Sequence, residues 1–144
     1  ASDGKANLHQ GAVGVGLDIA TGKPLRAVQN GQSILHHPDT GQDLSKLKID
    51  NWHELLVLAA SCYEMTGLGY LGADMVLDLN KGPMLLELNA RPGLTIQVAN
   101  GTGLLHRLKP IDRLSSTELN YHAEKRVSLA QTWFASQPLE ELTV

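Results

Sequence analysis

The sequence predicts an α+β fold built from short antiparallel strands and packed helices. Apolar residues alternate with glycine and aspartate over residues 13–19, which is typical of a strand. Over residues 52–63 apolar residues recur at intervals of three and four, the spacing of one helix face. Two apolar runs flank a short turn within residues 71–89, which indicates a β-hairpin.

The strands of the first region follow from its turns. Residues 20–23 form a turn between a strand at 13–19 and a second strand at 24–30, and we expect a third strand near 33–37. The Pro38–Gly41 segment has β-turn composition. Residues 11–16 are rich in glycine but lack the dinucleotide-binding order, so they predict a strand packed closely against another backbone.

Capping residues bound the predicted helices. Asp50 or Asn51 is the expected N-cap of the first helix, which ends at Gly67. After the hairpin we expect a loop and short helices to about Arg107. Pro110 should then break the chain before a helix from about Ser116 to Ser136.

Composition narrows the class of protein. The chain has 144 residues and a net charge of -3, which fits one globular domain and gives no basic face for nucleic acid. Its single cysteine, Cys62, excludes an internal disulfide and predicts a buried free thiol. Every apolar run is shorter than the roughly 18 residues that span a bilayer, so we expect no membrane partner and a cytoplasmic location.

The hairpin brings two acidic residues together. A two-residue loop at Asn80–Lys81 would place Asp74 opposite Glu87 and Gly72 opposite Asn89. A loop at Lys81–Gly82 would keep the same faces, whereas a three-residue loop would not. The other face would be wholly apolar, with these pairs: Ala73 with Leu88, Met75 with Leu86 and Leu77 with Met84.

Opposed carboxylates need a countercharge. Asp74, Glu87 and Asn89 offer only hard oxygen ligands, which suit Mg²⁺ or Mn²⁺ rather than zinc. Because magnesium often combines one or two carboxylates with substrate phosphates, the set indicates a nucleotide. The alternative is a solvent-facing polar surface, with Lys81 or Arg91 neutralising the acids.

Two segments resemble a known family. Gly72–Val76 followed by Gly82–Gly93 is similar to the C-terminal metal-binding hairpin of the ATP-grasp ligases, and most similar to the glutamate-ligase branch that modifies a ribosomal protein, with its alpha-L-glutamate ligase-like relatives. Lys5–Gly11 resembles a second segment of that branch. The resemblance implies the C-terminal portion of an ATP-grasp fold, an antiparallel sheet with helices packed on one face. We expect residues 1–112 to form this subdomain and residues 113–144 a helical extension that packs on it or mediates self-association.

The resemblance also implies a chemistry. ATP would phosphorylate a carboxylate, and an amine would then displace phosphate, with glutamate or a similar amino acid as one substrate and a small molecule, peptide or protein as the amine acceptor. Asp74, Glu87 and Asn89 would hold the Mg²⁺ (or Mn²⁺) that accompanies ATP. Arg91 would grip a phosphate or the acyl phosphate, or instead form a salt bridge to Glu87.

The family's remaining site residues have counterparts here. An extended segment would turn Lys5, Asn7 and His9 to one side, with Lys5 and Asn7 near the phosphates and the acceptor, whereas a histidine such as His9 is more often structural. By strand parity Val76 and Leu85 share the metal-bearing face. Candidates to contact ATP are Val76, Leu85, Leu86 and Asn89.

The adenine hinge and most phosphate-binding lysines of an ATP-grasp enzyme come from an N-terminal half. This half is the expected partner, and we expect the 144 residues alone to bind MgATP weakly and to catalyse nothing. The alternative is a non-catalytic module that binds a nucleotide or a protein partner through the same hairpin.

Overall fold

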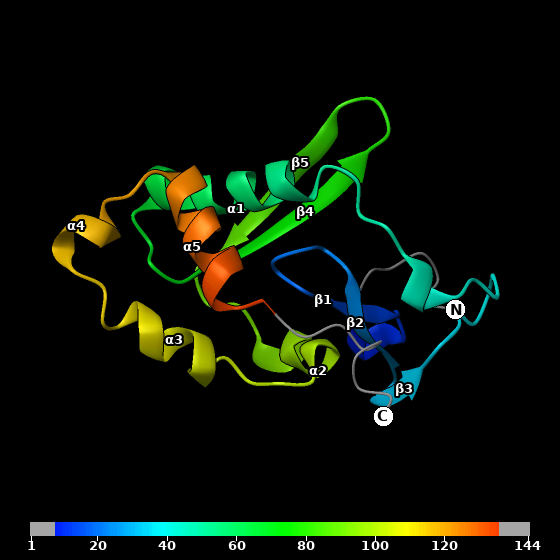
Figure 1. Cartoon of the computed structure of the whole chain (residues 1–144). Coiled ribbons are helices and arrows are strands. Elements are labelled where there is room, and N and C mark those ends of the chain that lie inside the picture. Colours follow the sequence, from blue (N-terminus) through cyan, green and yellow to red (C-terminus); the bar gives the residue numbers. More distant parts are fainter. Residues whose placement is uncertain (1–7, 136–144) are drawn as a thin grey trace.

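The computed structural model describes residues 8–135, and it confirms the α+β class. Its strands form two antiparallel groups, a three-stranded sheet in the order β1-β2-β3 and a hairpin of β4 and β5 (Figure 1). The strands are β1 (Gly14–Leu17), β2 (Pro24–Gln29), β3 (Gln32–Ile34), β4 (Gly72–Asp78) and β5 (Gly82–Asn89). The helices are η1 (Leu8–Gln10), η2 (Leu44–Lys46), α1 (Trp52–Thr66), η3 (Leu94–Ile96), α2 (Gln97–Asn100), α3 (Leu105–Ile111), α4 (Ser116–Leu119) and α5 (Ala123–Trp133).

The three-stranded sheet confirms the predicted turns. Buried Asp18 holds the turn between β1 and β2, because its Oδ2 accepts hydrogen bonds from the backbone N of Thr21 (2.9 Å) and from its Oγ1 (2.6 Å). The third strand is shorter than predicted and ends at Ile34. The chain then turns through residues 38–41, and His36 forms an isolated bridge to Asp43.

The glycines of β1 allow the close backbone approach that the sequence predicts. A Cβ atom on Gly16 would overlap the carbonyl oxygen of Ala99 in α2 and would lie 2.7 Å from its carbonyl carbon. Ala99 is itself almost fully buried. The lack of a side chain at this position therefore lets α2 pack directly on the sheet.

Helix α1 contacts both the hairpin and the β1–β2 turn of the three-stranded sheet. It begins after Asn51, whose φ of 57° is left-handed and whose side chain makes no capping bond, and it ends as predicted at Gly67 (φ 67°). Its contacts are with β5 and with α5, and Cys62 is a fully buried free thiol as expected. At its start the Trp52 indole donates to the Ile19 carbonyl (3.0 Å), which ties α1 to the β1–β2 turn.

The C-terminal helices differ from the prediction. Pro110 lies inside the last turn of α3 instead of ending the helix before it. Proline has no backbone N–H, so the last turn of α3 lacks the hydrogen bond from residue 110 to the His106 carbonyl. The continuous helix expected over residues 116–136 is two helices, α4 and α5, separated at residues 120–122, and α5 ends at Trp133.

The break allows α5 to lie against α1. The Arg126 guanidinium donates to the Tyr121 carbonyl at the break and reaches α1, where it bonds the Ala60 carbonyl (2.9 Å) and the Glu64 carboxylate (2.7 Å). Gln131 donates to the Ala20 carbonyl (3.0 Å). The division at residues 112 and 113 stays a prediction. No helix within residues 8–135 is both long and apolar enough to cross a membrane.

Candidate functional site

The hairpin places the two predicted acids directly opposite each other. Asp74 pairs with Glu87 and Gly72 with Asn89, as the sequence predicts. The side chains of Asp74, Glu87 and Asn89 are exposed. Alternation along the two strands therefore puts two carboxylates and an amide on one open face of the hairpin.

Beyond this pair the register differs from the prediction. Met75 pairs with Leu85 and Leu77 with Pro83, so the predicted pairs Met75–Leu86 and Leu77–Met84 are wrong. The loop is the three residues 79–81, followed by Gly82 at φ 72°. A β-bulge between Asp74 and Met75 leaves Leu86 as the extra residue in β5 and compensates for the longer loop.

The bulge changes which apolar side chains accompany the acids. Leu85 lies on the opposite face, paired with Met75, so the expectation that it shares the metal-bearing face is wrong. Val76 remains on the face of Asp74, and its partner there is Met84. Leu86, at the bulge, is 63% exposed. The adenine contacts predicted for these residues stay predictions.

The acidic pair forms no ion pair with another described residue. Within residues 8–135 no ion pair joins Asp74 or Glu87 to Lys81 or Arg91. No group of three or more His, Cys, Asp or Glu side chains in the same range is arranged to hold a metal. Two carboxylates plus an amide match a magnesium ion that keeps water and phosphate ligands.

The turn after β5 holds Arg91 next to the acidic face. The Asn89 Oδ1 accepts a hydrogen bond from the backbone N of Arg91 (2.9 Å), which leaves one lone pair of this oxygen for a cation. A Cβ on Gly72 would lie 2.9 Å from the Cβ of Pro92. The bare backbone of Gly72 thus lets the turn fold back on β4. This role of Gly72 was not predicted, although a glycine two residues before Asp74 is a signal present in the sequence.

The two N-terminal candidates, Lys5 and Asn7, lie outside the described residues. The chain immediately after them is the 3-10 helix η1 at Leu8–Gln10. The extended segment expected to carry Lys5, Asn7 and His9 on one side therefore does not continue through His9.

The chain matches a known protein family. A family described as sugar-transfer associated ATP-grasp matches residues 1–113. This chain belongs to the sugar-transfer associated ATP-grasp family. The predicted ATP-grasp superfamily is thereby confirmed, and the finer assignment to the glutamate-ligase branch is not supported. No curated protein and no solved structure shows a significant match.

Membership of this family indicates the general type of function. As an ATP-grasp domain, the chain has an ATP-binding, ligase-type function. Its α+β architecture of antiparallel strands and packed helices is that of a partial ATP-grasp fold.

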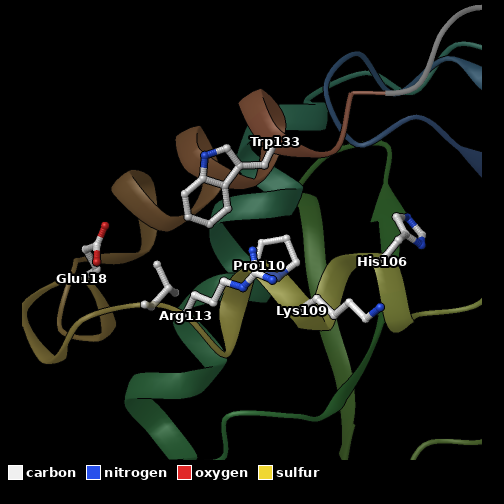
Figure 2. Close-up of a pocket in the computed structure, with 7 residues that line it drawn as sticks. His106, Lys109, Pro110, Arg113, Glu118 and Trp133 are labelled. Carbon is white, nitrogen blue, oxygen red and sulfur yellow. The ribbon is translucent and has the colours of Figure 1, made fainter.

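The ATP-grasp chain also has a hollow of about 410 Å³ away from the hairpin (Figure 2). Its lining comes from α3, the turn after it, α4 and α5, with these residues: His106, Lys109, Pro110, Arg113, Leu114, Glu118 and Trp133. In Figure 2 Lys109 and Glu118 extend toward opposite sides of the view. Glu118 is also held by Ser115, whose hydrogen bonds lower its pKa. The charged groups do not converge, so we assign no binding or catalytic role to this hollow.

Proposed function

We propose that this chain is the C-terminal half of an ATP- and Mg²⁺-dependent carboxylate–amine ligase. The observation that carries the proposal is the exposed cross-strand pair of Asp74 and Glu87, which forms no ion pair within residues 8–135 and is followed by Asn89. Opposed carboxylates destabilise a sheet unless something neutralises them, and a cation bound with a nucleotide would do so.

The proposed reaction has two steps. A carboxylate oxygen of the substrate attacks the γ-phosphorus of ATP, the bond to the β,γ-bridging oxygen breaks, and ADP leaves. The amine nitrogen then attacks the acyl carbon, inorganic phosphate leaves with the bonding electrons, and the amine loses a proton. The products are an amide, ADP and phosphate.

The donor set fits the metal that this chemistry uses. Asp74 and Glu87, with Asn89, would hold Mg²⁺ or Mn²⁺, which would neutralise negative charge on the ATP phosphates. Arg91 would hold the transferred phosphoryl group or the acyl phosphate through its planar fork. Lys5 and Asn7 would contact phosphates and the acceptor, and Val76, Leu85 or Leu86 would contact adenine.

The face of Asp74, Glu87 and Asn89 is exposed, as expected if another segment of the protein covers it to complete the site. We propose that an N-terminal ATP-grasp half supplies this segment and that the assembled site acts in the cytoplasm. The resemblance names glutamate or a similar amino acid as the carboxylate substrate and a small molecule, peptide or protein as the acceptor. The family description associates these ATP-grasp domains with sugar transfer and names no acceptor. The competing function is a non-catalytic module that binds nucleotide or a partner through the hairpin.

The test is the substitution Glu87→Gln. We expect it to weaken MgATP binding to the chain by about tenfold or more, because the metal loses a charged ligand, and to lower ligation by the intact gene product by orders of magnitude. Glu124→Gln on α5 is the matched control and should leave both unchanged. Calorimetry measures binding, and ADP release measures turnover.

Three outcomes separate the possibilities. Loss of both binding and turnover in Glu87→Gln supports the ligase. MgATP binding by the chain without turnover by the intact gene product favours the non-catalytic module. A Glu87→Gln chain that binds MgATP as tightly as the unmodified chain contradicts the metal assignment.

A further inference from the structure

An apolar groove lies beside the end of the hairpin. Its volume is about 690 Å³, within the roughly 300–1,000 Å³ that is usual for small-molecule sites. It is formed by the loop before β4, the turn after β5, the start of η3 and one side of α3. The lining residues are Tyr70, Ala90, Arg91, Pro92, Leu94, Leu104, Leu105 and Leu108.

This groove is mostly apolar and carries a single positive charge. Arg91 is the only charged side chain among the described lining residues, and it has no ion pair within residues 8–135. Leu94 and Leu105 are 60% and 64% exposed, and Tyr70 is 46% exposed. Exposed apolar side chains that lie together with one cation in the same lining are typical of a site for an apolar ligand with one anionic group.

The position of Arg91 gives the ligand a direction. Arg91 follows Asn89 by two residues, and its backbone N–H is fixed to the Asn89 side chain. The anionic end of a ligand bound by Arg91 would therefore lie at the turn after β5, and its apolar part would lie toward Leu105 and Leu108 of α3. A carboxylate so held would lie two residues along the chain from Asn89, one of the proposed metal ligands.

We propose that this groove binds the carboxylate substrate and that this substrate is a monocarboxylate with an apolar chain or ring. The inference rests on the proposed ligase function and narrows it. Glutamate fits the groove poorly, because its second carboxylate and its amine would lose water against leucine side chains that offer no hydrogen bonds.

The test compares four probes by NMR titration of the chain: acetate, octanoate, glutamate and octanamide. We expect octanoate to bind about tenfold or more tightly than acetate, since each buried methylene contributes up to about fourfold in affinity. Glutamate should bind no more tightly than acetate. Octanamide, which has the chain without the charge, should bind more weakly than octanoate.

Two variants and a control locate the site. Leu105→Gln should weaken octanoate by about fivefold and leave acetate unchanged, because it removes apolar contact only. Arg91→Gln should weaken both carboxylates and leave octanamide unchanged. Leu35→Gln replaces a leucine that is 73% exposed and lies outside the groove, and it should change nothing.

Several results would overturn the inference. These are equal affinity for acetate and octanoate, tighter binding of glutamate than of octanoate, or equal effects of Leu35→Gln and Leu105→Gln. Octanoate binding that is lost in the intact gene product also overturns it, since the groove would then be covered by another part of that protein.

MgATP binding in the same samples separates this inference from the proposed function. If MgATP binds through Glu87 but octanoate does not follow the expected order, only the substrate assignment fails. If octanoate follows the order but MgATP does not bind, the ligase proposal and the substrate role both fail, and an apolar carboxylate site remains.

Discussion

Glu64 and Glu87 are both exposed glutamates, yet their surroundings differ. Glu64 accepts two hydrogen bonds from the Arg126 guanidinium, at 2.7 and 2.8 Å, and these lower its pKa. Asp43 likewise serves the structure, because hydrogen bonds from Ser45 at the start of η2 lower its pKa to about 2. Glu87 faces another carboxylate instead and has no ion pair within residues 8–135. This contrast distinguishes the structural acids from the candidate metal ligands.

The Glu64–Arg126 pair predicts a pH dependence of stability. Because the pKa of Glu64 is lower in the folded chain than its ordinary value of 4.5, the unfolded chain takes up this proton first as the pH falls. The pair's contribution is present above about pH 4.5 and is lost as the pH falls through the folded pKa. In Glu64→Gln we therefore expect a smaller loss of stability between about pH 5 and about pH 3, measured by urea unfolding. An unchanged acid-side slope would contradict this.

The hairpin shows how an element adjusts to keep a functional pair in register. A three-residue loop would by itself move one strand's acids to the wrong face, and the bulge at Leu86 restores the pairing of Asp74 with Glu87. The apolar side is preserved as well, through the pairs Ala73–Leu88 and Met75–Leu85. The position of a bulge depends on both strands and on the loop together, which is why alternation within either strand did not predict it.

The close approach of Gly72 to Pro92 predicts that a larger residue at position 72 displaces the turn that carries Arg91. A methyl group at this position would lie 2.9 Å from the Pro92 Cβ, so Gly72→Ala should push the turn away from β4 at a cost of about 1–3 kcal/mol. We expect a larger loss of ligation by the intact gene product than Gly69→Ala causes, because no atom lies within 4 Å of the Cβ position at Gly69. Equal stability and activity of the two variants would rule out this role.

Packing of the whole molecule depends on contacts between distant segments. Sheet β1-β2-β3 contacts α2, and α1 lies between the hairpin and α5 (Figure 1). Two side chains from helices far apart in the sequence bond to the β1–β2 turn, Trp52 of α1 and Gln131 of α5. Helix α5 therefore packs on the same body as the strands, although it belongs to the segment predicted as an extension.

Gly16 tests this packing. Its missing side chain faces backbone atoms of Ala99 and Asn100, which cannot rotate away as a side chain can. We expect Gly16→Ala to destabilise the chain by about 3 kcal/mol in urea unfolding, since α2 must separate from the sheet. Gly103→Ala is the control, because its Cβ would have no neighbour within 4 Å. Similar unfolding midpoints for the two variants would show that α2 does not pack on β1 in this way.

The sequence by itself determined the α+β class, the limits of α1, the hairpin and the pairing of Asp74 with Glu87. These features depend on residues close together in the chain, where periodicity, capping glycines and turn residues act directly. Only the tertiary structure decided the bulge that turns Leu85 away, the separation of α4 from α5 and the groove beside Arg91. The bulge depends on the fit of two strands and their loop, the break on the packing of α5 against α1, and the groove on α3 lying near the turn after β5. Contacts of this kind between elements leave no regular spacing to be read from residues alone.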